Sequence, residues 1–417
     1  MKIYFLIISI LFSLKMFGQH WLPIQHDTVL NYLNKSGIEK EKKHEIILTG
    51  IADYSGTSIG KDIAQKFFFG GEITDSMKRR SLDRHKAVNR FGSDIQAEME
   101  YRNYQVNLFK HNNWGFVVKV GMYNFLQSIY SKDLFSFPMY GNSYFAGDTA
   151  NFSGSRFTNF TYQKIGFGWL DKKSKSAVSL NLFGLNNFAS LNLSEGEIYQ
   201  NLSMDSLNFS YNGTASFTGS KTYLKGIGAG IDADIRWQSK GLKGKPYFQF
   251  LMRNVGFISQ TTNQTTYKAD TSFNYVGFSY DQLAKGTTFQ AGNFAILDSL
   301  GISKSEKKST FLLPGMLQIS KLIDQSEDSK SKKLQEFYGA RLYLSNMAIP
   351  MIFAGIDYNP FNGLVHFGIS GNYGGFSKIK GGIYSSFKLN NFSFGLSSEN
   401  LFSKTGQSVI LRLQCVF

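Results

Sequence analysis

The stretch Tyr223–Trp237, YLKGIGAGIDADIRW, decides the fold. From Ile227 to Trp237 every odd position is apolar, whereas the even positions carry glycine, two carboxylates and a guanidinium. Successive side chains of a β-strand point to opposite faces, so this strand has one apolar and one polar face. A soluble sandwich strand alternates as well, but here the alternation is long and an aromatic residue lies at each end. Membrane-spanning strands need about 9–11 residues and meet aromatic girdles at both interfaces. The stretch therefore predicts a transmembrane β-strand.

Composition agrees with this prediction and excludes other classes. The chain has 417 residues, of which 16% are aromatic and 18% charged. No apolar run reaches the roughly 18 residues that a spanning helix needs. The net charge of +15 is spread over turns and loops without a recognisable nucleic-acid motif, so we expect no nucleic-acid partner. Cys415 is the only cysteine, which excludes an internal disulfide, and no residue pattern indicates a metal or a cofactor.

The N-terminus predicts export. Lys2 precedes the apolar run Ile3–Leu14, and a small residue, Gly18, ends the segment. We expect residues 1–18 to be a signal peptide that is cleaved after Gly18. Residues 19–44 are polar and form either a plug inside the barrel or a mobile periplasmic lead-in. Residues 45–417 form the barrel domain.

Similar alternation along the chain predicts an all-β transmembrane antiparallel barrel of about fourteen strands. An even number places both chain ends on the periplasmic side, with short turns there and long loops outside. The segment Ile323–Glu336 is the exception, because it is long but falls at the short-turn end. The expected strands are Glu45–Tyr54, Asp94–Leu108, Trp114–Phe125, Thr158–Trp169, Ala177–Phe188, Tyr223–Trp237, Tyr247–Ile258, Phe311–Leu322, Phe337–Ser345, Met351–Tyr358, Val365–Asn372, Lys378–Leu389, Phe392–Ser398 and Ser408–Phe417. The longest loops are expected at Ser55–Gly92, Ser131–Arg156, Leu191–Lys221 and Ser259–Thr310.

The alternation assigns charged side chains to the inner face. The candidates for facing the lumen are Glu98, Glu100, Lys119, Asp232, Asp234, Arg236 and Arg341. Charges inside a membrane protein must be hydrated or paired. They therefore either line water and tune selectivity or lock to one another across the lumen. We expect Gly230 to border water, a bulge near Asn254 and Gly256, and no clear facing for Arg253.

The last strand carries an expected assembly signal. Apolar side chains at every second position lead to the C-terminal aromatic residue: Leu411, Leu413, Cys415 and Phe417. This pattern resembles the C-terminal signal by which the barrel assembly machinery recognises outer-membrane barrels. Leu413 stands where that signal usually has a glycine. Pairing of this strand with the first one would remove an apolar, aggregation-prone edge.

Short glycine-rich phrases carry a family resemblance. They are Phe69–Ile73 (FGGEI), Asn89–Gly92 (NRFG), Leu182–Leu185 (LFGL) and Gly226–Asp232 (GIGAGID). With them the chain resembles a family of outer-membrane barrels without an assigned function, found in Gram-negative bacteria that use type IX secretion. It is more distantly similar to long-chain fatty-acid transporter barrels. The resemblance implies a fourteen-stranded barrel and an N-terminal plug, and it implies no substrate.

Two further features of the sequence bear on chemistry. His366 is the only histidine expected in the barrel wall, facing the lumen near Ser370, and without a positioned nucleophile it predicts no enzyme. The basic segment Glu72–Arg90 predicts a short helix in the first long loop. That helix either binds lipopolysaccharide or is a solvated face.

The sequence thus predicts a barrel in the cell outer membrane, in contact with lipid and lipopolysaccharide. Its first predicted function is a channel or transporter for a small solute, including a hydrophobic one. The alternative is a non-conducting barrel that binds a partner in secretion or surface attachment.

Overall fold

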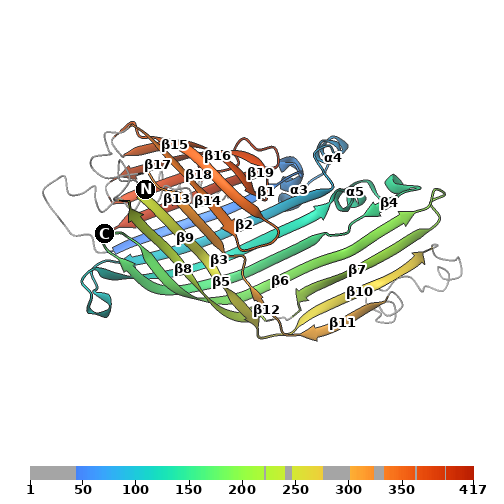
Figure 1. The fold of residues 1–417 in the computed structure, drawn as a ribbon, viewed down its shortest axis with the longest axis horizontal. Coiled ribbons are helices and arrows are strands. Elements are labelled where there is room, and N and C mark those ends of the chain that lie inside the picture. Colours follow the sequence, from blue (N-terminus) through green and yellow to red (C-terminus); the bar gives the residue numbers. More distant parts are fainter. Residues whose placement is uncertain are drawn as a thin grey trace, which may run out of the picture.

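Fourteen antiparallel strands close into a barrel in the computed structural model, which describes residues 44–219, 222–239, 247–275, 301–323, 333–361, 364–389 and 391–417 (Figure 1). The predicted fold class and strand number are confirmed. The ring contains β1 (His44–Gly56), β2 (Val88–Asn103), β3 (Trp114–Ser131), β5 (Arg156–Asp171), β6 (Ala177–Gln200), β8 (Gly226–Gln238), β9 (Tyr247–Gln260), β12 (Thr310–Leu312) with β13 (Met316–Lys321) in one position, β14 (Leu334–Tyr343), β15 (Ile349–Tyr358), β16 (Val365–Gly375), β17 (Ile379–Leu389), β18 (Phe392–Ser398) and β19 (Gly406–Val416).

The first and last strands close the ring. β1 pairs with β19 from Glu45↔Val416 to Ser55↔Gly406, and its other edge pairs with β2. At the seam the backbone N–H of His44 donates to the carbonyl of Phe417 at 3.0 Å, and the N–H of Phe417 returns a bond to His44 at 3.0 Å. Closure leaves no unpaired edge at this seam. We call the end of the barrel at His44 and Phe417 the terminal end, and the opposite end the loop end.

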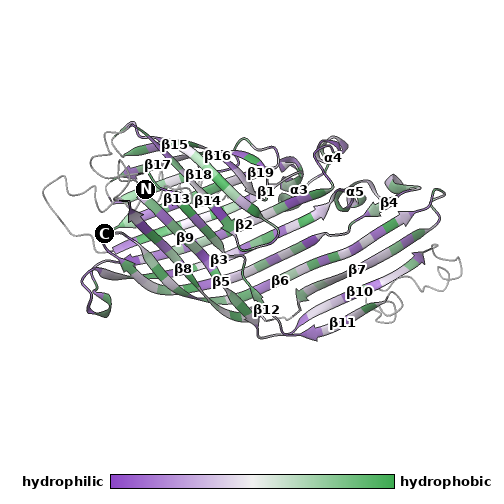
Figure 2. Ribbon diagram, viewed as in Figure 1, coloured by the Kyte–Doolittle hydropathy of each residue, from purple (hydrophilic) through white to green (hydrophobic). Residues whose placement is uncertain are grey.

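The strands alternate between an apolar outer face and a polar inner face, which Figure 2 shows as alternating green and purple along the ribbon. In β8, Ile227, Ile231 and Ile235 are exposed, whereas Asp232 and Asp234 are buried. The predicted strand started too early, because β8 begins at Gly226 and Tyr223 lies in the preceding connection. The apolar face of β8 nevertheless ends in an aromatic residue, Trp237, which stacks on Phe248 of β9.

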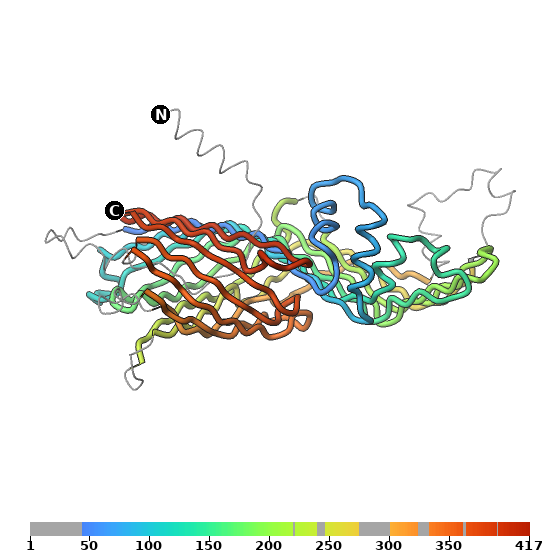
Figure 3. The backbone as a smooth tube through the Cα atoms, turned by 90° about the horizontal axis from the view of Figure 1, so that it is seen from above, coloured from blue at the N-terminus to red at the C-terminus, as the bar shows by residue number. Residues whose placement is uncertain are grey.

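A sheet projects from the loop end, where the sequence predicts loops (Figures 1 and 3). β6 has 24 residues, and only its first part pairs with β8. Its second part pairs with β4 (Thr149–Asn151) and β7 (Leu207–Thr218), and the sheet continues through β10 (Gln264–Tyr275) to β11 (Ile302–Lys307). We call β4, the second part of β6, β7, β10 and β11 the extension. The predicted loops Leu191–Lys221 and Ser259–Thr310 are therefore wrong in part, because both contain strands.

Helices cover the first two long connections of the loop end. They are α3 (Lys61–Phe69), α4 (Asp75–Leu82) and α5 (Lys132–Tyr140), together with the 3₁₀ turn η3 (Asn142–Phe145). A second 3₁₀ turn, η2 (Leu108–Lys110), lies at the terminal end. Ile63 of α3, Phe135 of α5 and Tyr130 of β3 form the core between the helices and the sheet. The predicted helix within Glu72–Arg90 is confirmed as α4. No helix among the described residues is long and apolar enough to cross a membrane.

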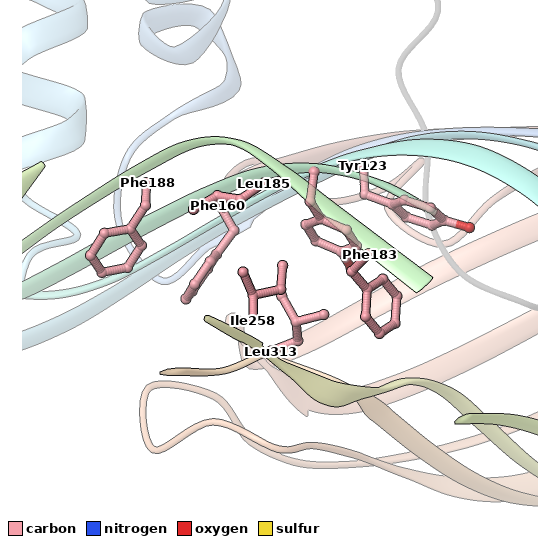
Figure 4. Packing of buried hydrophobic residues seen from close by; sticks show 8 residues of the cluster. Tyr123, Phe160, Phe183, Leu185, Phe188, Ile258 and Leu313 are labelled. Carbon is pink, nitrogen blue, oxygen red and sulfur yellow. The ribbon is translucent and has the colours of Figure 1, made fainter. Parts of the chain in front are cut away.

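Part of the barrel interior near the loop end is an apolar core. Figure 4 shows Ile258 and Leu313 packed among aromatic rings that include Phe160, Phe183 and Phe188. Ring centroids of Phe160 and Phe188 lie 5.1 Å apart, and Phe311 stacks on Phe188 at 4.5 Å. Aromatic pairs at such distances add to the stability that burial provides. The barrel is thus packed inside rather than empty at this level.

Candidate functional site

The residues predicted to face the lumen are all buried. Their exposed fractions are at most 7%: Glu98, Glu100, Lys119, Asp232, Asp234, Arg236 and Arg341. Several contact strands that are not their neighbours in the ring, and such contacts are made only across the interior. Side chains that line a water-filled pore would be exposed. Within the described residues, these charges are therefore enclosed by other side chains.

At the centre of these contacts is Lys164 of β5, which the sequence analysis missed. Its ammonium lies 2.7 Å from the Glu98 carboxylate and 2.8 Å from that of Asp232. Lys119 adds a second cation, 3.5 Å from Asp232 and 3.9 Å from Glu100. Glu98 also accepts a hydrogen bond from the Tyr123 hydroxyl. Each carboxylate thus has a cation beside it, as buried charges require.

Arg253 of β9 makes a contact across the interior of the barrel. Its guanidinium lies 2.6 Å from the Glu98 carboxylate of β2 and 4.0 Å from Asp232. Strands β3, β5, β6 and β8 separate β2 from β9 in the ring. We call Glu98, Glu100, Lys119, Lys164, Asp232 and Arg253 the central ion network. It contains three carboxylates and three cations, so it is formally neutral.

A β-bulge explains why the facing of Arg253 could not be predicted. The register between β8 and β9 shifts between Ile231 and Ala233, and Asn254 has φ 52°. The backbone N–H of Asn254 consequently donates to the Asp232 carboxylate at 2.7 Å, while the Asn254 side chain accepts from Lys164 at 3.0 Å. The bulge was predicted near Asn254, and its position is confirmed. It aims Arg253 inward, as bulges re-aim side chains.

A second group of charges lies nearer the terminal end. Arg102 donates to Glu100 at 2.6 Å and lies 3.6 Å from Glu45. Arg236 lies 2.6 Å from Asp234, which also accepts from Gln249 at 2.7 Å. These pairs continue the ion network along the barrel axis.

A third group lies toward the loop end. Arg341 donates to Gln318 at 2.7 Å and contacts both carboxylate oxygens of Glu399 at 3.4 Å. Asp53 of β1 accepts from the Asn400 amide at 2.7 Å. All these side chains are buried, so charged and polar contacts occupy the interior at three levels.

An apolar layer also crosses the interior. Phe125 of β3, Tyr343 of β14 and Phe376 lie with ring centroids 5.8–6.1 Å apart, and Leu251 and Met316 complete the cluster. Phe376 follows β16, whose last two residues, Gly374 and Gly375, have positive φ values and turn the chain inward. Such φ values suit glycine because it lacks a Cβ atom. We call this cluster the aromatic layer.

Gly230, which the sequence predicts to border water, is half-buried on the inner face of β8. A Cβ atom there would lie 2.4 Å from the Val255 carbonyl and 2.7 Å from the Phe183 ring. The inner face of β8 is therefore in close contact with its neighbours. Glycine is needed at this position because backbone and ring approach too closely for any side chain.

His366 belongs to a separate buried group. Its Nδ1 lies 2.8 Å from the Asp357 carboxylate, whose other oxygen accepts from the Tyr384 hydroxyl at 2.7 Å. Ser370 is on the same strand face, four positions along. The Ser370 hydroxyl is buried without a hydrogen-bond partner among the described residues, so the geometry provides no positioned base for it.

The basic helix α4 is held mainly by local contacts. Arg80 lies 2.9 Å from Asp62, and Lys78 lies 3.0 Å from Asp75. His85, which follows the helix, stacks on Phe135 with ring centroids 4.2 Å apart. Burial in this apolar contact lowers the pKa of His85 to about 4.

The expected assembly residues lie on the outer face of the last strand and its end. Ile410 and Gln414 are buried inside, whereas Cys415 is exposed and Phe417 is 55% exposed. The Phe417 ring stacks on His44 at 5.5 Å. Recognition by the assembly machinery stays a prediction.

The extension has two unlike faces. On β7 the odd positions are Leu207, Phe209, Tyr211, Gly213, Ala215 and Phe217, and the even positions between them are polar. Phe209 stacks on Phe273 of β10 at 4.8 Å, and Phe217 stacks on Tyr267 at 5.6 Å. Near β6 the same face is covered by Phe145 and Phe152, whereas Phe217 remains 41% exposed. The sequence predicts these residues to be loop, so this surface was not expected.

Comparison with protein-family models and with curated proteins finds no match. Among solved structures, the chain is similar to the TodX deltaS2S3 mutant monoaromatic hydrocarbon channel (7% identity, 89% of each chain, TM-score 0.39). It is also similar to the translocator domain of the autotransporter NalP from Neisseria meningitidis (8% identity, 93% of each chain, TM-score 0.30) and to the transport unit of the autotransporter AIDA-I from Escherichia coli (7% identity, 91% of each chain, TM-score 0.25). At such low similarity, these structures add no argument to the strand pairing described above. The family suggested by the glycine-rich phrases stays a prediction.

Proposed function

We propose that this chain is a barrel of the outer membrane that conducts no ions and uses its extension to hold a protein partner at the cell surface. The observation that carries the proposal is the contact between Arg253 and Glu98, which joins β9 to β2 across the interior at 2.6 Å. The aromatic layer adds a second barrier along the same path. A barrel filled in this way serves as a rigid anchor.

The pairing of the lumen charges supports an anchor more than a selectivity filter. Asp232 is 0% exposed and lies beside Lys164, so no water surrounds its carboxylate. Selectivity residues act on ions that pass beside them. Passage of a small solute, the function predicted first from the sequence, would require the central ion network and the aromatic layer to open together.

The extension supports the partner-binding part. A row of aromatic side chains on β7 and β10 is partly exposed. The opposite face of the same strands is polar and provides matched control positions. Aromatic residues are enriched in the centres of protein interfaces. The length of β6 places this face beyond the barrel (Figure 1).

Site-specific photo-crosslinking in living cells tests the partner. We expect a crosslinker at Phe217, on the aromatic face, to give one discrete high-mass product. The matched position is Asn208, which is exposed on the polar face of the same strand, and we expect no such product there. Absence of a product at Phe217, or equal products at both positions, would reject the docking face.

Membrane fractionation tests the location. We expect the folded protein in the outer-membrane fraction, migrating faster on a gel before heating than after it. A soluble protein, or a band that heating does not shift, would remove the barrel anchor from consideration.

A further inference from the structure

An apolar cavity lies in the wall of the barrel near the loop end. Its volume is about 660 Å³, within the roughly 300–1,000 Å³ of ligand pockets. Its residues come from α3, from β16 to β19 and from the β18–β19 connection. It is separate from the central ion network and from the extension.

The cavity exists because β18 is short. β18 has 7 residues, whereas β17 and β19 have 11 each. β18 ends at Ser398, which pairs with Ile383 of β17, so β17 and β19 continue toward the loop end without a strand between them. The gap in the wall is bordered by Ile383, Leu396 and Val409.

The walls of the cavity belong to the outer apolar surface. Phe367, Ile383 and Leu396 line it and are 40–48% exposed, and their positions alternate with buried inner residues. The outward band of a membrane barrel faces lipid chains. The cavity is therefore continuous with the surface that faces the hydrocarbon core, and a lipid chain has direct access to it.

The roof of the cavity is polar and carries a cation. Lys61 and Gln65 of α3 line this side. The helix is fixed there, because Gln65 donates to Gln407 of β19 at 2.8 Å and the backbone N–H of Lys61 donates to Lys404 at 3.0 Å. Among the described residues no carboxylate forms an ion pair with Lys61, so its charge is available to an anion.

The end of α3 places this roof at a membrane surface. Phe67, Phe68 and Phe69 are 61%, 44% and 46% exposed at the end of the helix. Aromatic residues of membrane proteins concentrate at the boundary between hydrocarbon and water. A cation at this boundary lies at the level of lipid head groups.

We propose that the cavity binds a lipid, with an acyl chain against Ile383 and Leu396 and an anionic head group at Lys61. The arrangement combines an apolar slot open to lipid with one cation at its mouth. This site is independent of the partner proposed for the extension.

Native mass spectrometry of the purified barrel tests the site. The probes are phosphatidylglycerol and phosphatidylcholine with identical chains, added to delipidated protein. We expect the parent barrel to retain phosphatidylglycerol, and Leu396→Trp, which fills the slot, to lower its occupancy about tenfold. Ile352→Trp is the matched control, because Ile352 is 61% exposed on β15 and does not line the cavity. Equal retention by Leu396→Trp and Ile352→Trp would overturn the proposal.

The head group is tested separately. We expect Lys61→Gln to bind the two lipids equally, whereas Lys66→Gln on the same helix keeps the preference for phosphatidylglycerol. Glycerol phosphate, which has no chains, should not displace the lipid. A preference that survives Lys61→Gln would overturn the anionic head group, and displacement by glycerol phosphate would overturn the lipid itself.

Discussion

At the level of single residues, the interior of the barrel is filled by charged side chains that form ion pairs with one another. Strand alternation was enough to place Asp232 and Asp234 inside, because apolar and polar residues alternate without interruption in the sequence of β8. It was not enough for Lys164, because the alternation of apolar and polar residues along the sequence of β5 reverses midway. Phe160 and Tyr162 point inward while Asn159 and Thr161 point outward, bonded to Asn124. Hydropathy therefore gave no consistent face for β5.

Lys164→Ala should destabilise the barrel strongly. It removes the cation between Glu98 and Asp232, and breaking a buried ion pair by removing one partner costs about 3–5 kcal/mol. The midpoint of urea unfolding in lipid vesicles measures the change. Lys321→Ala is the control, because its partner Glu336 is 70% exposed and such pairs contribute about 1 kcal/mol or less. Similar losses in both variants would show that the central ion network is not a special source of stability.

Gly230→Ala should also destabilise the barrel. The added methyl group would meet the Val255 carbonyl at 2.4 Å, and backbone cannot move aside as a flexible side chain can. Gly371→Ala, in β16, adds the same group where nothing lies within 4 Å, and should leave stability unchanged or slightly raised. Both are compared in the same unfolding experiment. Equal stability of the two variants would contradict the close packing inside β8.

His85 should make the helical cap sensitive to acid. The apolar contact with Phe135 lowers the pKa of His85 from near 6.5 to about 4 in the folded cap. Between these values the unfolded segment takes up a proton that the folded segment excludes. Stability of the cap therefore falls as the pH drops from 6.5 to 4. Hydrogen exchange of α4 at several pH values measures this. His85→Phe should remove the pH dependence, and an unchanged dependence would assign it to another group.

At the scale of elements, the ring strands were predictable and the extension was not. A strand that borders lipid on one side must alternate, and that requirement left a clear pattern in most of the fourteen segments, with β5 and β9 as exceptions. The strands of the extension lie in segments where long loops are expected, so the sequence pattern did not reveal them. The alternation of Phe209, Tyr211 and Phe217 with polar residues was nevertheless readable.

Deletion of Phe417 should impair assembly more than synthesis. The residue supplies the last backbone bonds of the seam to His44 and an outward aromatic ring. The amount of folded protein in the outer membrane, relative to total protein, measures the effect. Phe392→Ala, at an exposed aromatic position of β18, should assemble normally. Normal assembly after deletion of Phe417 would count against the signal.

For the whole molecule, the structure distinguishes a locked interior from an open one, which the sequence could not do. The polar inner residues indicated a lumen, and either an open or a locked interior satisfied the same pattern. Only the distances between strands far apart in the ring show the charges in contact. Residues 1–43, which contain the predicted signal peptide and the predicted plug, lie outside the described residues.

Ion conductance of the barrel in planar lipid bilayers tests the filled interior most directly, with a general porin as the positive control for insertion. We expect no current steps from the parent protein, because Arg253 and Glu98 join β9 to β2 across the interior and the aromatic layer crosses the same path. We also expect the double substitution Asp232→Asn and Asp234→Asn to lower stability without creating ion selectivity. Regular current steps from the parent protein, with a selectivity that this double substitution changes, would show that the interior is an open channel.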